Sequence, residues 1–308
     1  MHPEISPYQR CVEGSKRVRF DIDRDVIRGR AFEFNQKFLP DGLSKSQSLT
    51  FLDEHERILF SQIQGRTYAN LFGLVERFIG PKMAEVSQHH WLGDQHAFEA
   101  LMRFTDEELK HQEMFRRIER MIAQGMPGGY TFLPKPNDVA GAVLSKCTWA
   151  VLGLICHIEI FVLSHYRQAI EPDANLSALW KDVFTFHARE EAQHAIVDEL
   201  EWQREDARLS DGLRDQAVDD LIDLVAAVDG ILQMQAGADA EYFLKVCGRN
   251  LRPTEEDSIR KTMLAAYRWQ YIVSGVQDGR FQKMLGGLIS AEQMERIGTA
   301  LKPILAAS

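Results

Sequence analysis

Long amphipathic stretches dominate the chain from about residue 47 onward. Within them, apolar residues recur at every third or fourth position, which places them on one face of an α-helix. The helices expected from this spacing cover residues 49–63, 67–86, 94–124, 138–169, 176–208, 213–248, 254–278 and 290–301. No segment alternates apolar and polar residues as a half-buried strand would. The pattern therefore predicts an all-α protein.

Turn residues and changes of pattern divide the chain into three regions. Residues 1–46 have a mixed pattern and are expected to form an N-terminal arm that is irregular apart from one short helix. Residues 47–209 are expected to form a helical bundle, kinked at Pro81, where proline removes a backbone donor. Residues 210–308 are expected to form further helices that pack on the bundle.

Three potential metal ligands lie close together in the helix expected at 176–208. His187, Glu191 and His194 are spaced i, i+4 and i+7, so their side chains project from one helix face. A second Glu-x-x-His motif, formed by Glu108 and His111, lies in the helix expected at 94–124. Glu76 and Glu159 are lone acids within mostly apolar runs. A buried carboxylate must find a cation or take a proton, so these two glutamates complete the candidate set.

The spacing of the four glutamates supports a common site. Glu76 and Glu108 are 32 residues apart, and Glu159 and Glu191 are also 32 residues apart. The midpoint of each interval falls in a predicted turn, so each pair belongs to a helical hairpin. At 1.5 Å per residue, both carboxylates of a hairpin lie roughly 24 Å from its bend. Two such hairpins placed face to face bring all four glutamates to one level.

This ligand set determines the expected metal chemistry. Two Glu-x-x-His motifs with one glutamate from each of two further helices form the ligand set of ferritin-like di-metal carboxylate bundles. We therefore expect a ferritin-like four-helix bundle with extra C-terminal helices. Carboxylate and imidazole ligands favour two iron ions, with manganese as the alternative. An apolar wall around the ions is expected from Phe72, Phe104, Phe115, Leu163 and Phe184. Glu107 and Glu190, and more weakly Asp198, are expected to orient the opposite histidines.

Structural interpretations compete with these assignments. Thr105 to Glu108 matches a capping box, which would make Glu108 a helix-start residue. His187 fits a core or supporting histidine as well as a ligand. The remaining histidines outside the motifs are expected at the surface or in turns: His55, His89, His90, His96 and His165. His157, two residues before Glu159, is expected to point away from the site.

Composition excludes several classes of partner. The net charge of −9 and the pI near 5.6 argue against nucleic acid or an anionic membrane as the main partner. Four cysteines without a Cys-x-x-Cys pair argue against a disulfide framework or a zinc knuckle. The apolar run 139–163 is interrupted by Lys146, His157 and Glu159, which favours a buried core helix over a membrane span. With no apolar segment at the N-terminus, the expected location is cytoplasmic.

The order of the motifs resembles a known enzyme family. One Glu, Glu-x-x-His, one Glu and then His-x-x-x-Glu-x-x-His is similar to the di-iron N-oxygenases of the p-aminobenzoate N-oxygenase type, over about residues 67–199. The resemblance implies a seventh ligand, His187, beside Glu76, Glu108, His111, Glu159, Glu191 and His194. Ribonucleotide reductase radical subunits are less similar, because Phe115 stands where they have tyrosine. Acyl-carrier-protein desaturases share both motifs but lack the added histidine.

The resemblance implies a dioxygen-activating, non-haem di-iron oxygenase that acts on a small organic substrate, with N-oxygenation of an amine as the more specific form. Two alternatives stay open. One is a di-iron desaturase or hydroxylase of a carrier-bound acyl chain, and the other is a dinuclear metal protein that binds metal or detoxifies peroxide. Dioxygen, a small-molecule substrate and an electron donor of unidentified kind are the expected partners. The oligomeric state is open, with a homodimer as one option.

Overall fold

The computed structural model describes residues 5–306, and every regular element within them is helical. Twelve α-helices, α1 to α12, follow one another along this part of the chain. The strand-like pairing found among the described residues is a single isolated bridge between Lys37 and Leu176. The prediction of an all-α fold is confirmed.

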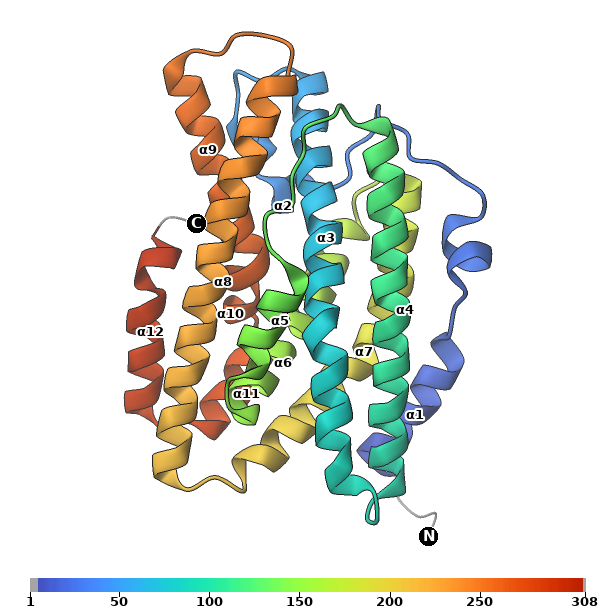
Figure 1. The fold of residues 1–308 in the computed structure, drawn as a ribbon, viewed down its shortest axis with the longest axis vertical. Helices are drawn as coiled ribbons and strands as arrows, with labels where there is room; N and C mark the ends of the chain where they lie inside the picture. Colours follow the sequence, from blue (N-terminus) through green and yellow to red (C-terminus); the bar gives the residue numbers. More distant parts are fainter. Residues whose placement is uncertain (1–4, 307–308) are drawn as a thin grey trace.

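Four long helices form the central bundle of the molecule. They are α3 (Glu54–Ser87), α4 (Gln95–Gly125), α6 (Thr148–His165) and α7 (Ala178–Asp206). α3 and α4 lie side by side as one hairpin, and α6 and α7 pair as the second (Figure 1). The hairpins meet through contacts of α3 with α6 and of α4 with α7. This is the face-to-face arrangement that the equal glutamate spacings predict.

α3 differs in detail from the prediction, whereas α4 agrees with the helix expected at 94–124 to within a residue at each end. α3 is one continuous helix through the expected break at 64–66, because Gln64 and Gly65 are buried in the core. The helix is also continuous through Pro81, and the kink expected there stays a prediction, because a kink does not interrupt a helix. α4 begins directly after Asp94, whose side chain accepts hydrogen bonds from the backbone of His96 and Ala97. The capping-box interpretation of Thr105 to Glu108 is therefore wrong, because these residues lie inside α4.

The single helix expected at 138–169 is interrupted. α5 (Pro136–Leu144) ends before α6 begins at Thr148, and the last turn of the segment is the π-helix η4 (Tyr166–Ile170). α8 satisfies the polar groups at the break. Asp220 accepts a hydrogen bond from the backbone N–H of Cys147 at 3.1 Å and from Lys146 Nζ at 2.9 Å. These bonds compensate for the helical hydrogen bonds lost between α5 and α6.

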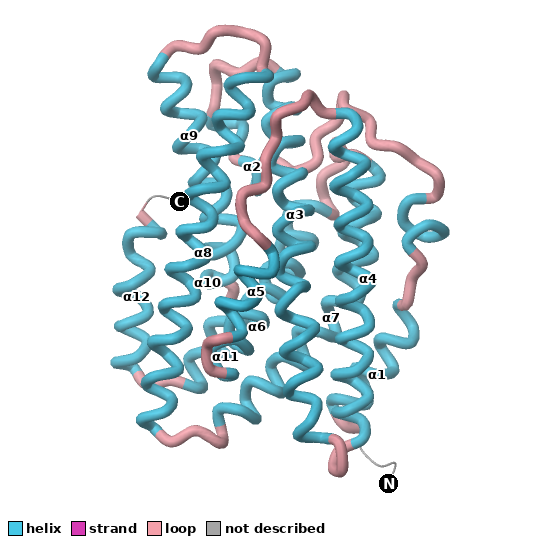
Figure 2. The backbone as a smooth tube through the Cα atoms, in the orientation of Figure 1, coloured by secondary structure: helices cyan, strands magenta, loops and turns pink. Residues whose placement is uncertain are grey.

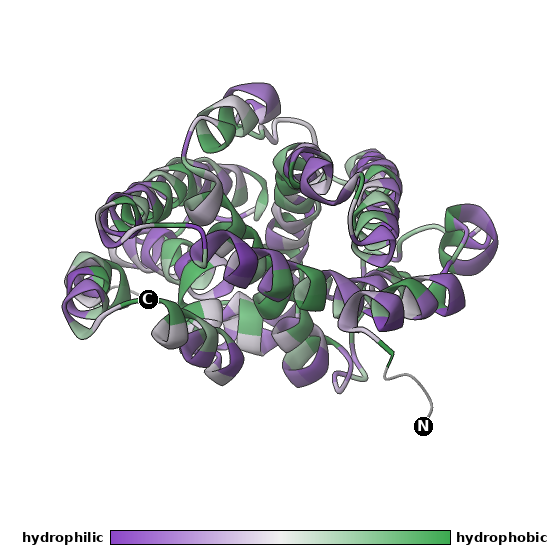
Figure 3. Ribbon diagram, turned by 90° about the horizontal axis from the view of Figure 1, so that it is seen from below, coloured by the Kyte–Doolittle hydropathy of each residue, from purple (hydrophilic) through white to green (hydrophobic). Residues whose placement is uncertain are grey.

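The C-terminal helices form a layer beside the second hairpin. They are α8 (Asp211–Val246), α9 (Pro253–Arg268), α10 (Ser274–Gln277), α11 (Gly279–Leu288) and α12 (Ala291–Leu305), with the π-helix η5 (Trp269–Val273) between α9 and α10. α8 packs on α6, and α12 packs on α8 (Figure 2). The sequence pattern missed α11 and the π-helix. Seen along the helices, apolar faces meet in the interior between these layers (Figure 3).

The N-terminal segment is more ordered than the expected irregular arm. α1 (Pro7–Val18) packs on both α4 and α7, at the side of the bundle opposite α12 (Figure 1). The π-helix η1 (Ile22–Ile27) and the short helix α2 (Asp41–Ser44) follow. Residues 1–4 of the expected arm and residues 307–308 lie outside the described part of the chain. α1 therefore covers the bundle where its two hairpins meet.

Two helical segments are long and apolar enough to span a membrane by length and composition alone. In the first, Thr148–Ile170, 89% of the apolar window is buried inside the protein, as in a core helix. In the second, Asp211–Val246, 33% is buried. This pattern is compatible with a soluble protein and agrees with the core-helix interpretation of residues 139–163.

Candidate metal centre

The seven predicted ligands come together inside the four-helix bundle. Each is at most 2% exposed to solvent. α3 contributes Glu76, α6 contributes Glu159, and the remaining residues come from the two motif helices. On α4 these are Glu108 and His111, and on α7 they are His187, Glu191 and His194. The four glutamates thus reach one region from four different helices.

Six of the seven residues form two overlapping groups whose ligand atoms lie within 4.8 Å of one another. One group consists of Glu76, His111, His187 and Glu191, and the other of Glu108, His111, Glu191 and His194. His111 and Glu191 belong to both groups, so they lie at the middle of the centre. Glu159 is outside both groups, but burial raises its pKa and it is close enough to Glu191 for the charge of that residue to raise the pKa further.

The ligand atoms approach one another closely. His194 Nδ1 and Glu191 Oε2 form a hydrogen bond at 2.6 Å, but several other close pairs do not. Glu108 Oε1 lies 2.9 Å from His194 Nδ1, and His187 Nε2 lies 2.6 Å from Glu191 Oε1. Yet neither carboxylate oxygen of Glu108 and neither ring nitrogen of His187 has a hydrogen bond of acceptable geometry among the described residues. Such orphaned atoms are costly when buried. Lone pairs that converge on a common point are what metal coordination requires, so these residues fit a metal ion.

The side chains that lack partners are spread over the whole set. Besides those of Glu108 and His187, the buried atoms without a hydrogen bond include Glu76 Oε2, His111 Nδ1 and Glu159 Oε2. Five of the seven predicted ligands therefore keep at least one coordinating atom free of hydrogen bonds. Buried His and Glu groups of this kind could hold a metal ion.

Burial and mutual charge set the protonation of the centre. Burial lowers the pKa of His111 and His194, but the negative Glu191 outweighs it and raises both pKa values well above normal. Burial opposes the charged form of Glu191 too, yet the surrounding histidines hold its pKa well below its usual range. Burial and then the charge of Glu191 raise the pKa of Glu159 well above normal. Metal cations would replace these protons, so their affinity should increase with pH.

Two further glutamates hold the motif histidines in a crossed arrangement. His111 of α4 contacts Glu190 of α7, with 2.9 Å between Nε2 and Oε2. His194 of α7 contacts Glu107 of α4, with 2.8 Å between the corresponding atoms. The predicted contacts of Glu107 and Glu190 with the opposite histidines are confirmed, and these bonds leave Nδ1 of each ring toward the centre. That they orient metal-bound rings stays a prediction. Asp198 differs from the prediction: it is fully buried, and neither of its carboxylate oxygens has a hydrogen-bond partner within residues 5–306.

Residues of the N-terminal segment support these glutamates, which the sequence did not indicate. Ser15 of α1 donates a hydrogen bond to Glu107 Oε1 at 2.5 Å. Phe20 stacks nearly parallel to His111, with ring centroids 6.4 Å apart. Lys110 lies 4.1 Å above the Phe20 ring and donates to Glu190 Oε1 at 2.5 Å. Only the position of Lys110 before His111 in the motif offered a signal for this contact.

Aromatic side chains enclose the centre as predicted. Phe104 stacks on His194 with centroids 3.7 Å apart. Phe115, Phe72 and Phe184 meet the His187 ring edge-on, at centroid distances of 5.0, 5.6 and 6.0 Å. Leu163, the fifth predicted wall residue, is buried at 3% exposure. The ligand atoms therefore lie in a dry environment, in which electrostatic interactions are strong.

Two histidines expected at the surface are buried instead. His90 contacts Glu201 at 2.8 Å, and His165 contacts the Tyr68 hydroxyl group at 2.8 Å. Both are satisfied by hydrogen bonds, in contrast to His187. His157 behaves as predicted: it faces away from the centre and contacts the backbone carbonyl of Ile272 at 3.0 Å.

Comparison with known proteins adds no relative. No protein-family model matches the chain, and no curated protein matches it. The case for a metal centre therefore rests on the residues and their geometry. That case is the convergence of buried, incompletely hydrogen-bonded Glu and His side chains from four helices.

Proposed function

We propose that this protein is a dioxygen-activating, non-haem di-iron oxygenase that acts on a small organic substrate. One observation carries the proposal: two four-residue ligand groups, fully buried, share His111 and Glu191. Shared residues between neighbouring groups are the arrangement expected where a carboxylate bridges two ions. The motif order, which resembles the p-aminobenzoate N-oxygenase type, gives the proposal its enzyme class.

The donor set favours iron. Glu76, Glu108, Glu159 and Glu191 supply four negative charges, which would neutralise two divalent cations. The histidines supply neutral nitrogen donors, and no cysteine is among the ligands. This mixture of oxygen and imidazole donors suits iron or manganese better than soft, thiolate-bound metals. We propose two iron ions, with manganese as the alternative.

The chain's own residues would prepare the site for oxidation. A pair of redox-active ions would supply the electrons that reduce dioxygen. Glu107 and Glu190 hold the imidazoles of His194 and His111 in a fixed orientation. The phenylalanine wall excludes water, which protects a reactive site from side reactions. His187, both of whose ring nitrogens lack hydrogen bonds, is available as a further donor on the side bordered by Phe115.

A second candidate function is the oxidation of a carrier-bound acyl chain by desaturation or hydroxylation. One observation favours it: two cavities beside the second hairpin are lined almost wholly by apolar side chains. N-oxygenation of an amine depends instead on His187 acting as a ligand. Replacing His187 distinguishes the N-oxygenase from the desaturase candidate, because the desaturase ligand set does not include this histidine and its reaction with dioxygen should be unaffected.

Metal analysis after anaerobic reconstitution with Fe(II) tests the proposal. We expect two tightly bound ions per chain and rapid dioxygen consumption that is visible by stopped-flow absorbance. His111→Ala should lose metal, whereas His96→Ala, an exposed position on the same helix, should not. Fewer than two ions per chain at saturation would refute a dinuclear centre. Two bound ions without any reaction with dioxygen would refute the oxygenase assignment.

A further inference from the structure

Two apolar cavities lie side by side next to the bundle. The larger has a volume of about 650 Å³ and lies between α6, α8, α11 and α12. The smaller, of about 70 Å³, lies between α3, α5, α6 and α8. Leu154, Val228 and Tyr271 line both cavities, so the two spaces lie on either side of these residues. The larger volume is within the usual range for a small-molecule site, about 300–1,000 Å³.

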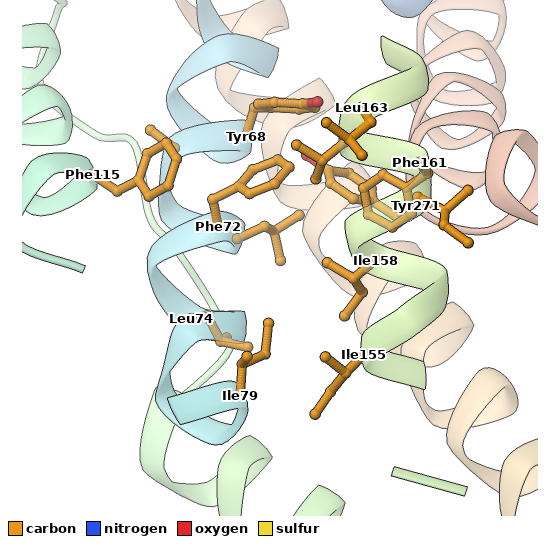
Figure 4. Packing of buried hydrophobic residues seen from close by; sticks show 14 of the residues in the cluster. Tyr68, Phe72, Leu74, Ile79, Phe115, Ile155, Ile158, Phe161, Leu163 and Tyr271 are labelled. Atoms are coloured by element: carbon orange, nitrogen blue, oxygen red, sulfur yellow. The ribbon is translucent and has the colours of Figure 1, made fainter. Parts of the chain in front are cut away.

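The smaller cavity extends toward the metal centre. Phe72 and Phe161 are part of its wall, and their ring centroids are 6.4 Å apart. Figure 4 shows both rings beside Tyr271 in the space between α3 and α6. The Phe72 ring also contacts the His187 ring nearly at a right angle, with centroids 5.6 Å apart. One aromatic side chain therefore stands between this cavity and a candidate metal ligand.

Tyr271 lines both cavities and carries a buried hydroxyl group. The residue is 8% exposed, and its hydroxyl oxygen is buried without a hydrogen-bond partner in the described chain. The neighbouring polar groups are engaged. His157 bonds to the carbonyl of Ile272, and both carboxylate oxygens of Asp229 accept hydrogen bonds from Arg268. A buried hydroxyl group without a partner is costly, and a ligand atom would satisfy it.

We propose that the two cavities together bind the substrate, and that this substrate is an elongated, mainly apolar molecule with one hydrogen-bonding group near its reactive end. This inference rests on the function proposed above. The body of the molecule occupies the larger cavity, and the hydrogen-bonding group meets the Tyr271 hydroxyl group. The reactive end enters the smaller cavity and reaches the metal centre past Phe72.

The lining explains why such a molecule would be selected. Apolar side chains from α8 and α12 favour an apolar ligand, because each Å² of apolar surface that it buries contributes roughly 25 cal/mol to the binding free energy. A small, strongly charged molecule would lose its hydration without finding an opposite charge, because Asp229 and Arg268 already neutralise each other. Tyr271 then acts as a positioning residue that fixes how far the molecule enters.

Fluorescence titration of the full-length, metal-free protein with 1-aminoanthracene and with anthracene tests the inference. These probes share an apolar body and differ by one hydrogen-bonding amine. We expect saturable binding of one 1-aminoanthracene per chain. Tyr271→Phe should weaken 1-aminoanthracene about five-fold, the equivalent of one neutral hydrogen bond, and leave anthracene unchanged. Equal effects on both probes would overturn the role of Tyr271.

A second pair of variants tests the location. Val228→Trp places a large side chain where the cavities meet and should weaken both probes at least ten-fold. Ala227→Trp, at an exposed position of α8 outside both linings, should change neither. If the Val228→Trp variant folds and still binds the probes, the inference is overturned. It is also overturned if only a monomer binds the probes and the protein forms a dimer that buries this face.

Paramagnetic broadening tests the connection to the metal centre. The probe's NMR signals should broaden in protein loaded with Mn(II) and stay sharp in protein loaded with Zn(II), with metal content measured in the same samples. Two bound Mn(II) ions with sharp probe signals would overturn the inference and leave the proposed function intact. Probe binding without any metal binding would refute the proposed function and, with it, the assignment of the cavities to a metal-dependent reaction.

Discussion

Glu190→Gln tests how far the metal centre depends on the residues that orient its histidines. Glu190 is fully buried, accepts a hydrogen bond from Lys110 at 2.5 Å and contacts His111 Nε2 at 2.9 Å. Glutamine keeps the size of the side chain, but it is neutral and has only one accepting oxygen. The variant therefore keeps at most one of two charge-assisted bonds, each of which contributes about 1.5–3 kcal/mol.

The expected result is a loss of metal affinity without a loss of fold. Changes of this kind to the partners of ligating histidines weaken metal binding about 10–100-fold, or roughly 1.4–2.8 kcal/mol. The metal-free protein should lose less stability than that, because a buried negative charge disappears along with the bond. Competition between the protein and a chelator for Mn(II) measures the affinity, and urea unfolding measures the stability.

Glu113→Gln is the matched control for this prediction. Glu113 lies on α4, pairs with Arg116 and Arg117 near the surface, and does not contact the centre. Its replacement should leave Mn(II) affinity within about two-fold, because exposed ion pairs contribute little. Unchanged affinity in Glu190→Gln would refute the claim that the crossed glutamates orient the histidines. If both variants lose Mn(II) affinity equally, the cause is the change in overall charge and not the contact with His111.

Three further predictions concern single residues. His187→Ala should lower metal affinity at least ten-fold and change the kinetics of dioxygen consumption; unchanged metal content and kinetics would remove His187 from the ligand set. Burial raises the pKa of Asp239 to about 7, so its contribution to stability is complete below about pH 4 and is lost as the pH rises through 7. Urea unfolding at several pH values should show that Asp239→Asn removes this loss, of up to about 4 kcal/mol; parallel pH profiles would contradict it. Gly153→Ala should cost about 1–3 kcal/mol in thermal unfolding, because its Cβ would lie 2.7 Å from the Trp202 ring, and wild-type stability would show that the ring moves aside freely.

The helical bundle and its ligands were predictable because their signals are local and periodic. Helix spacing placed Glu108 and His111 on one face, and the equal 32-residue intervals placed the carboxylates at one level. The cross-pairing of Glu107 with His194 followed from the same geometry, since each acid precedes a ligand on a facing helix. These features depend on helix pitch and hairpin symmetry, both of which follow from the spacing of residues in the sequence.

Features that depend on distant contacts were not predictable. The break between α5 and α6 exists where Asp220, more than 70 residues later, bonds the backbone of Cys147. His90 and His165 looked like surface residues, because their partners Glu201 and Tyr68 lie on other helices. The N-terminal arm gave no chemical signal, since Ser15 and Phe20 acquire their roles only when α1 docks.

The docking of α1 would link metal loading to the order of folding, if the centre holds metal as proposed. Gly14 lets α1 lie close to α7, because a Cβ at this position would be 2.9 Å from the Gln193 side chain. Tyr8 donates to Glu201, 193 residues away, so this contact cannot form until α7 has been synthesised. α1 therefore docks on α7 only after a long intervening stretch of chain has been made, and long-range contacts of this kind form slowly. Until then the side of the bundle around Glu107 and Glu190 lacks the cover of α1, and an ion could reach through this side the centre that the finished protein encloses.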